Sequence, residues 1–154
     1  MTRIILLVED NPSDEALTLR AFKKSGISNE VVVTRDGAEA LDYLFCTGTY
    51  AHRNPAEMPT VILMDLNLPK VGGLEALRRI RGAESTKLIP VVILTSSDEE
   101  EDRLKGYEIG ANSYVRKPVE FNQFASAVQQ LGLYWLILNE PVPPKNGKST
   151  KHET

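Results

Sequence analysis

The chain has 154 residues, of which 42% are hydrophobic and 25% charged, and its formal net charge is -3. This composition fits a single compact domain large enough to bury most of its apolar surface. The acidic balance predicts no basic face that could bind nucleic acid. The one cysteine cannot form an intrachain disulfide, and the apolar run at residues 4–8 is too short for a signal peptide or a membrane span. We therefore expect a soluble cytoplasmic protein.

Apolar runs of strand length alternate with segments of helical periodicity along most of the chain. The runs have few polar interruptions, which is typical of strands buried on both faces of a parallel sheet. The predicted strands span residues 4–8, 30–34, 89–94 and 113–116, and a central strand begins at residue 61 and carries Asp65 at its carboxyl edge. The predicted helices begin at Pro12, after Gly37, at Gly72-Gly73, after Ser97 and at Pro118. The side chain of Asn11 is expected to cap the first of them.

Five strands alternating with five helices predict an α/β fold of the flavodoxin-like, doubly wound kind, with a parallel sheet in the order 2-1-3-4-5. The polar segment 46–59 is too irregular for an element and is interpreted as an insertion. Residues 1–139 are expected to form the domain, which ends in a long helix. Residues 140–154 hold prolines and few apolar side chains, so they are expected to be a disordered tail.

Polar side chains follow several of the predicted strands at the point where each strand ends. In an open parallel sheet the carboxyl ends meet at one edge, where ligands bind. Three carboxylates gathered there would repel one another unless a cation neutralised them, and Mg²⁺ prefers hard oxygen ligands of this kind. The cluster therefore predicts a magnesium site. The residues expected at this edge are Glu9, Asp10, Asp65, Thr95 and Lys117.

Asp65 lies at the end of the most continuous apolar run. A carboxylate beside bound Mg²⁺ can attack phosphorus and form an acyl phosphate, and Asp65 is the acid placed to do so. The Thr95 hydroxyl and the Lys117 ammonium can stabilise charge on the phosphoryl oxygens. Taken singly, each of these residues has an ordinary alternative as a turn residue or a surface charge. Tyr114, in the short last strand, is more typical of packing than of a switch.

Five short motifs follow one another along the chain. They are Glu9-Asp10-Asn11, Met64-Asp65-Leu66-Asn67-Leu68-Pro69, Thr95-Ser96-Ser97, Gly110-Ala111 and Lys117-Pro118. Each motif alone is weakly specific, whereas the ordered set is highly specific. As a set they resemble the receiver domain of two-component response regulators, a family that includes the chemotaxis regulators. The resemblance covers about residues 3–131.

The resemblance implies a role for each residue of the acidic edge. Asp65 would be the phosphoacceptor, and it would hold Mg²⁺ together with Glu9, Asp10 and the backbone carbonyl of Asn67. Lys117 would pair with the phosphoryl oxygens. The protein would then signal by phosphorylation rather than act as an enzyme.

The resemblance also implies a conformational switch. Thr95 would move onto the phosphoryl group while Tyr114 turns inward, remodelling the face formed by the fourth helix, the fifth strand and the fifth helix. The peptide bond before Pro118 would be cis, as proline permits. One departure from the family pattern is Gly72, where many receivers carry an aspartate, and this departure questions the stability of the turn.

More narrowly, residues 11–14, the 46–59 insertion and the turn at 66–70 resemble the stand-alone regulators that partner bacterial phytochrome histidine kinases. A histidine kinase, in particular a phytochrome kinase, is therefore the expected partner. One alternative is a phosphorelay intermediate that passes its phosphoryl group onward. Another is an aspartate-based phosphatase of the haloacid dehalogenase type, but that mechanism needs a second acid two residues after the nucleophile, where this chain has Asn67.

The predicted final helix becomes apolar on nearly every side after residue 132. One sheet face cannot bury all of these side chains, and exposed apolar patches of this kind usually mark interaction sites. The pattern predicts a two-fold symmetric homodimer. The alternative is that the proline-containing tail folds back over the helix. The predicted dimer contacts are Leu133, Tyr134, Trp135 and Ile137.

Overall fold

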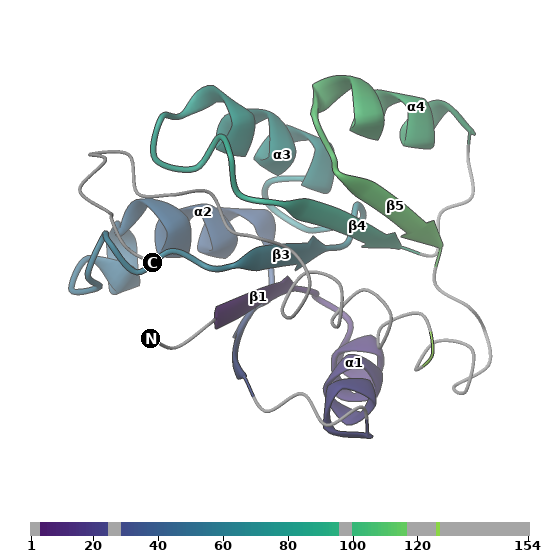
Figure 1. Ribbon diagram of the computed structural model, residues 1–154, viewed down its shortest axis with the longest axis horizontal. Helices are drawn as coiled ribbons and strands as arrows, with labels where there is room; N and C mark the ends of the chain where they lie inside the picture. The colour runs from purple at the N-terminus through teal and green to yellow at the C-terminus, as the bar shows by residue number, and fades with distance from the viewer. Residues whose placement is uncertain (1–3, 25–28, 96–99, 117–125, 127–154) are drawn as a thin grey trace, which may run out of the picture.

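The computed structural model describes residues 4–24, 29–95, 100–116 and 126. A central parallel sheet lies between two layers of helices, with α1 on one side and α2, α3 and α4 on the other (Figure 1). The strands, in chain order, are β1 (Ile4–Val8), β2 (Glu30–Thr34), β3 (Val61–Met64), β4 (Val91–Thr95) and β5 (Ser113–Arg116).

The sheet order is β2-β1-β3-β4-β5, and each neighbouring pair is parallel, which confirms the predicted topology. Strand β1 lies between β2 and β3, so Val8 pairs with Thr34 on one side and with Met64 on the other. All residues of β1 and β3 are buried, as expected for strands covered on both faces. β4 begins two residues later than predicted, because Pro90 has no N–H to donate to the ladder.

Four of the five predicted helices lie within the described residues. They are α1 (Pro12–Lys24), α2 (Gly37–Phe45), α3 (Gly73–Gly82) and α4 (Glu100–Ile109). The side chain of Asn11 caps α1 by accepting a hydrogen bond of 3.0 Å from the backbone N–H of Asp14, as the sequence predicts. The predicted fifth helix, apart from Ser126, and the predicted tail at 140–154 lie outside the described residues.

Each face of the sheet has its own apolar core. On one face, β1, β3 and β4 pack against α1 through Ala21 and Phe22. On the other, the alternate side chains of the same strands pack against α2 and α3 through Leu44, Leu77 and Ile80. The central strands are therefore packed between helices on both faces, and this packing holds the backbone at the sheet edge rigidly.

The insertion at 46–59 is more ordered than predicted, because it contains a single 3-10 turn, η1 (Gly48–Tyr50). The ring of Tyr50 packs edge-to-face against Tyr43 of α2, with centroids 5.2 Å apart. The Arg53 guanidinium lies 4.0 Å above the Tyr43 ring and donates hydrogen bonds to the carbonyls of Tyr43 and Glu57. These contacts give the segment an order that its composition does not indicate.

None of the helices within the described part of the chain is both long and apolar enough to cross a membrane.

Candidate metal and phosphoryl site

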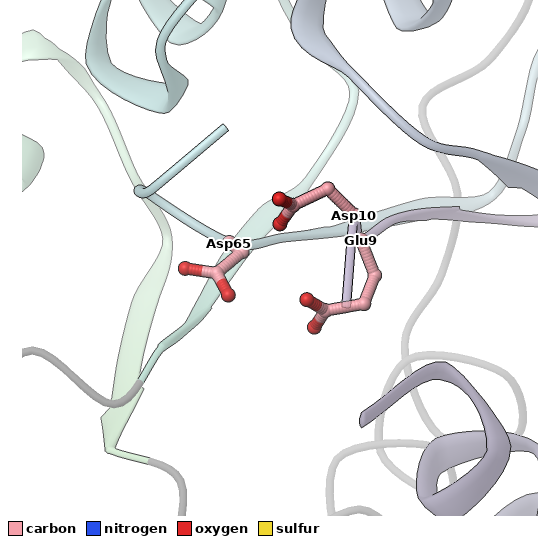
Figure 2. A group of neighbouring side chains, drawn as sticks. All are labelled: Glu9, Asp10 and Asp65. Atoms are coloured by element: carbon pink, nitrogen blue, oxygen red, sulfur yellow. The ribbon is translucent and has the colours of Figure 1, made fainter. Parts of the chain in front are cut away.

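Three carboxylates converge at the carboxyl edge of the sheet, where β1 and β3 lie side by side. Glu9 and Asp10 follow β1, and Asp65 follows β3. Figure 2 shows that their side chains point into one space, and each offers an oxygen within 4.8 Å of the others. The sheet order therefore brings together acids that are 55 positions apart, Asp10 at position 10 and Asp65 at position 65.

The backbone around these acids is held by the sheet itself. The N–H of Asp65 donates to the carbonyl of Val8 at 3.1 Å, and the N–H of Glu9 donates to the carbonyl of Thr34 at 3.0 Å. Both bonds extend the parallel ladders by one residue past the last strand positions. The two side chains therefore leave the sheet in directions set by its pleat rather than by a flexible loop.

The exposure of the three acids is unequal. Glu9 is 2% exposed and Asp65 is 7% exposed, whereas Asp10 is exposed. Two buried carboxylates beside a third carry a high electrostatic cost unless a cation neutralises them. An oxygen-only donor set with one side open to water is suited to a hard divalent cation that keeps part of its hydration shell. The site therefore fits a divalent metal.

The loop after β3 presents further groups to the cluster. The N–H of Asn67 donates to Oδ1 of Asp65 at 3.0 Å, so the loop orients the carboxylate. The N–H of Gly73, at the start of α3, donates to the carbonyl of Leu66 at 3.0 Å. This bond ties the helix N-terminus to the same loop.

Gly73 is a structural requirement of the site that the sequence analysis missed. A Cβ at this position would lie 2.5 Å from the carbonyl oxygen of Asp65 and 2.7 Å from the Cα of Leu66. Gly72, its neighbour, has nothing within 4 Å and an ordinary φ of -67°. The Gly-Gly pair in the sequence does not indicate which of the two is needed, because the contact is with a segment that only the fold brings near.

The structure describes the backbone of two further predicted site residues. Thr95 ends β4, the strand next to β3, and Tyr114 lies in β5, where it pairs with Ile93. Both strands have their predicted places in the sheet order, but the side chains of these two residues lie outside what the structure describes. Lys117, Pro118 with its predicted cis peptide bond, and the predicted dimer contacts at 133–137 also lie outside the described residues.

The chain matches a known protein family and is similar in sequence to individual proteins. The profile of the response regulator receiver domain matches residues 5–129. The chain is 39% identical over 141 residues to the probable methanogenesis regulatory protein FilR2 of Methanothrix harundinacea, covering 92% of this chain and 88% of that protein. It is 38% identical over 134 residues to the response regulator Rcp1 of Synechocystis, covering 87% and 89%.

Solved structures of phytochrome response regulators are similar to this chain. The bacteriophytochrome response regulator AtBRR is 57% identical, with a TM-score of 0.73 over 91% of this chain and 99% of that one. The phosphorylated cyanobacterial phytochrome response regulator RcpA is 38% identical, with a TM-score of 0.84 over 92% and 99%. The Mn²⁺-bound form of Rcp1 is 36% identical, with a TM-score of 0.83 over 91% and 99%.

Proposed function

Because the chain belongs to the response regulator receiver domain family, we propose that it receives a phosphoryl group on Asp65 from a histidine kinase. Receiver domains are signalling proteins rather than enzymes, and they interact with histidine kinases. The observation that carries the assignment to this residue is the convergence of Asp65 with Glu9 and Asp10 at the carboxyl edge of the sheet. Asp65 is the member of this cluster that follows β3, and its carboxylate is oriented by the Asn67 N–H.

In the proposed reaction, an oxygen of Asp65 attacks phosphorus and forms a P–O bond. The P–N bond to the kinase histidine breaks, and the imidazole leaves with the electron pair of that bond. The burial of Asp65 limits access of water to the acyl phosphate. The bond from Asn67 keeps the carboxylate aimed, so that less orientational freedom is lost on the way to the transition state.

We assign the metal as Mg²⁺, held by the carboxylates of Glu9, Asp10 and Asp65 and by the backbone carbonyl of Asn67. Bound Mg²⁺ would neutralise charge on the phosphoryl oxygens and on the clustered acids. The protein's own contribution is to hold these oxygen donors in place through the ladder bonds to Val8 and Thr34.

The switch belongs to the same proposal. Thr95 and Lys117 are assigned to the phosphoryl oxygens, and Tyr114 to the aromatic that turns inward as the face around α4 and β5 changes. The peptide bond before Pro118 is assigned as cis. Support comes from the positions of β4 and β5, which end at the same edge as β1 and β3.

We infer that the chain works as a stand-alone regulator of a phytochrome kinase in the cytoplasm. It spans 88% of FilR2 and 89% of Rcp1, but less than half of transcriptional regulators such as PhoP of Bacillus subtilis, where it covers 43%. The identities of 55% and 57% to two bacteriophytochrome response regulators favour a phytochrome partner. A role as phosphorelay intermediate uses the same acceptor, whereas a phosphatase role is not favoured because Asn67 cannot act as an acid.

Asp65→Asn tests the acceptor. The substitution is nearly isosteric and removes the attacking oxygen, so we expect no phosphoryl adduct by intact-mass spectrometry after incubation with kinase and ATP. Asp14→Asn, an acid on α1, is the matched control and should be phosphorylated like the parent. An adduct that persists in Asp65→Asn would overturn the assignment.

Asp10→Ala tests the metal. Removing a direct oxygen ligand should abolish metal-dependent phosphorylation, and a chelator should do the same in the parent protein. Phosphorylation of Asp10→Ala at the parental rate would show that the acidic cluster is not the metal site.

A panel of purified histidine kinases identifies the partner. We expect rapid phosphotransfer from phytochrome kinases, and slower transfer from kinases of other pathways. Preferential transfer from a kinase of another class would overturn the phytochrome assignment and leave the acceptor unaffected.

We also propose a homodimer formed through Leu133, Tyr134, Trp135 and Ile137. The support is the apolar character of this stretch in the sequence, with tryptophan and tyrosine as favoured interface anchors. Trp135→Glu combined with Ile137→Glu should give a monomer that still accepts phosphate. Sedimentation at micromolar concentration, with and without phosphorylation, measures this, and a parent protein of 17.1 kDa in both states contradicts it.

A further inference from the structure

The turn between β2 and α2, residues 34–37, contacts the backbone of Glu9 and the β3–α3 loop that follows Asp65, although it supplies none of the three acids. On the β1 side, the carbonyl of Thr34 accepts the bond of 3.0 Å from the N–H of Glu9. The hydroxyl of Thr34, which is fully buried, donates to the carbonyl of Leu7 at 3.4 Å. The position of this turn therefore helps to set the position of Glu9.

On the other side, the same turn packs against the loop that carries Asn67. A Cβ at Gly37 would lie 1.9 Å from the carbonyl oxygen of Val71, so only glycine permits this approach. The carboxylate of Asp36 forms an ion pair of 3.6 Å with Lys70, whose φ of 67° is in the left-handed region. The turn thus supports the β3–α3 loop in a conformation that a lysine rarely adopts.

Glu39, in the first turn of α2, holds the β2–α2 turn in place. Its Oε1 accepts a hydrogen bond of 2.9 Å from the N–H of Arg35, and its own N–H donates to Oδ1 of Asp36 at 2.7 Å. This reciprocal arrangement resembles a capping box, in which two groups at a helix start fix each other. The orientation of the Glu39 carboxylate therefore affects the whole turn.

The second oxygen of Glu39 is held by the insertion. The Tyr50 hydroxyl, on η1, donates to Oε2 of Glu39 at 2.7 Å. Burial and this hydrogen bond raise the pKa of Tyr50 to about 12, so the phenol remains a donor at any physiological pH. A continuous series of contacts therefore runs from Tyr50 through Glu39 and the turn to Glu9 and to the β3–α3 loop.

We propose that Tyr50 is a positioning residue for the metal site, acting through Glu39 and the β2–α2 turn. The function of the 46–59 insertion is then to hold this turn at the distance at which Glu9 and the β3–α3 loop face the metal together. The proposal rests on the assignment of Glu9, Asp10 and Asp65 as metal ligands, and it adds residues that touch neither metal nor phosphoryl group.

Tyr50→Phe tests the proposal, because it removes one hydroxyl and keeps the ring that packs on Tyr43. The matched control is Thr47→Val, which removes another insertion hydroxyl that donates to an α2 carboxylate, Asp42, at 2.7 Å. Asp42 lies toward the C-terminal end of α2, at the far end of the helix from the turn. Both variants therefore lose one hydroxyl–carboxylate bond, but only Tyr50→Phe loses one connected to the site.

The readouts are Mn²⁺ affinity, measured by electron paramagnetic resonance, and the rate of phosphorylation at subsaturating Mg²⁺. For Tyr50→Phe we expect Mn²⁺ affinity to fall by about threefold to tenfold, less than the ~10–100-fold typical for direct partners of metal ligands. Saturating Mg²⁺ should restore most of the rate. Thr47→Val should retain parental affinity while losing a similar amount of stability in urea. Equal affinities in the two variants would overturn the proposal.

A double-mutant cycle with Glu39→Ala shows whether Tyr50 acts through Glu39. If it does, Tyr50→Phe has no further effect on Mn²⁺ affinity once Glu39 is alanine. Additive losses would contradict the proposed route. The parent protein and Asp10→Ala separate this proposal from the metal assignment. A parent that binds no Mn²⁺, or an Asp10→Ala variant that binds Mn²⁺ as tightly as the parent, refutes the metal site. A parent that binds Mn²⁺ together with a Tyr50→Phe variant that binds it equally tightly refutes only the positioning role.

Discussion

Helices α2 and α4 lie on the same side of the sheet but are attached to it in different ways (Figure 1). Helix α2 buries Ala40, Leu41, Tyr43 and Leu44 in the core and is held from outside by the insertion. In α4, Gly106 alone is buried among residues 102–109, the positions whose exposure is described. Its large apolar side chains Leu104 and Tyr107 are 61% and 49% exposed.

The C-terminal end of α4 is nevertheless fixed. Arg81, on α3, donates at 2.8 Å to the carbonyl of Gly110, which directly follows α4, and at 2.8 Å to Oδ1 of Asn112. Its guanidinium also donates to the carbonyls of Lys87 and Ile89 at 3.0 and 2.7 Å. Among residues 102–109, α4 is thus held at its C-terminal end, where Ile109 packs partly buried against the core beside the polar contacts of Arg81.

The difference matches the roles proposed for the two sides of the site. In the proposed function the β2–α2 turn stays fixed, because it supports the assigned metal ligands, and it adjoins a well-packed helix. The face around α4 is the part proposed to change, and a helix with little buried apolar area can move at a low cost in free energy. The four predictions below test this contrast in order of decreasing effect on stability.

Arg81→Ala should have the largest effect. It removes the four hydrogen bonds that join α3, the α3–β4 loop and the end of α4, so we expect a loss of about 2–4 kcal/mol in the free energy of unfolding. Urea denaturation measures this. Arg79→Ala is the control, because it breaks an exposed ion pair with Glu75 and should cost less than about 1 kcal/mol. Similar losses in both variants would show that Arg81 does not hold α4.

Gly73→Ala should destabilise the edge that carries the site. Its Cβ would meet backbone atoms of Asp65 and Leu66, which cannot turn aside as a side chain can, so we expect a loss of about 1–3 kcal/mol in spite of the better helix propensity of alanine. Metal affinity should fall as well. Gly72→Ala, with open space around the position, is the control and should be nearly neutral. A Gly73→Ala variant with the free energy of unfolding and the metal affinity of the parent would mean that the loop after β3 is not tightly held.

Stability should decline at alkaline pH in a way that depends on Tyr50. The pKa of this phenol is raised from 10.0 to about 12 in the folded protein, so its contribution is complete below pH 10 and is lost as the pH rises through about 12. We expect Tyr50→Phe to remove on the order of 1–2 kcal/mol of this pH dependence, at ~1.4 kcal/mol per pKa unit with allowance for partial exposure. Burial raises the pKa of Tyr43 too, and this accounts for a residual slope.

The measurement is urea denaturation at pH 9 and at pH 12, with Tyr107→Phe on α4 as the control. The control should retain the parental difference between the two pH values. If Tyr50→Phe retains it as well, the hydroxyl of Tyr50 is not held by Glu39 in solution.

Leu104→Ser should have the smallest effect. The side chain is 61% exposed, and surface substitutions of this kind usually change stability by less than about 0.5 kcal/mol. Leu44→Ser in α2 is the contrasting variant, since Leu44 is fully buried and should lose several kcal/mol. Urea denaturation of the pair measures the difference directly. Comparable losses would show that α4 is packed as firmly as α2.

Patterns local in the sequence were sufficient for much of the fold. Continuous apolar runs predicted buried strands, and Asn11 before Pro12 predicted a capped helix, because strand burial and helix capping depend on residues a few positions apart. The strand order was predicted as the leading flavodoxin-like topology for strands and helices that alternate with right-handed crossovers. The acids of the site were also predicted from local patterns, since each lies at the carboxyl end of a predicted strand.

The segment 46–59 shows where local patterns fail. Its composition predicted an irregular insertion, but Arg53 and Tyr50 pack on Tyr43 of α2 and order a turn. The concern over Gly72 is likewise resolved by the structure, which gives that residue an ordinary φ and open space. Both outcomes depend on neighbours that the sequence pattern does not identify.

The sequence by itself determined which groups are available for chemistry and at which strand ends they lie, because hydrophobic periodicity and turn residues are local signals. Only the tertiary structure decided which groups support them. The supporting contacts join segments whose distance and orientation follow from the packing of whole helices on the sheet. These contacts are Gly73 with Asp65, Gly37 with Val71, and Tyr50 with Glu39. A glycine or a tyrosine in the sequence carries no mark of the partner it will meet.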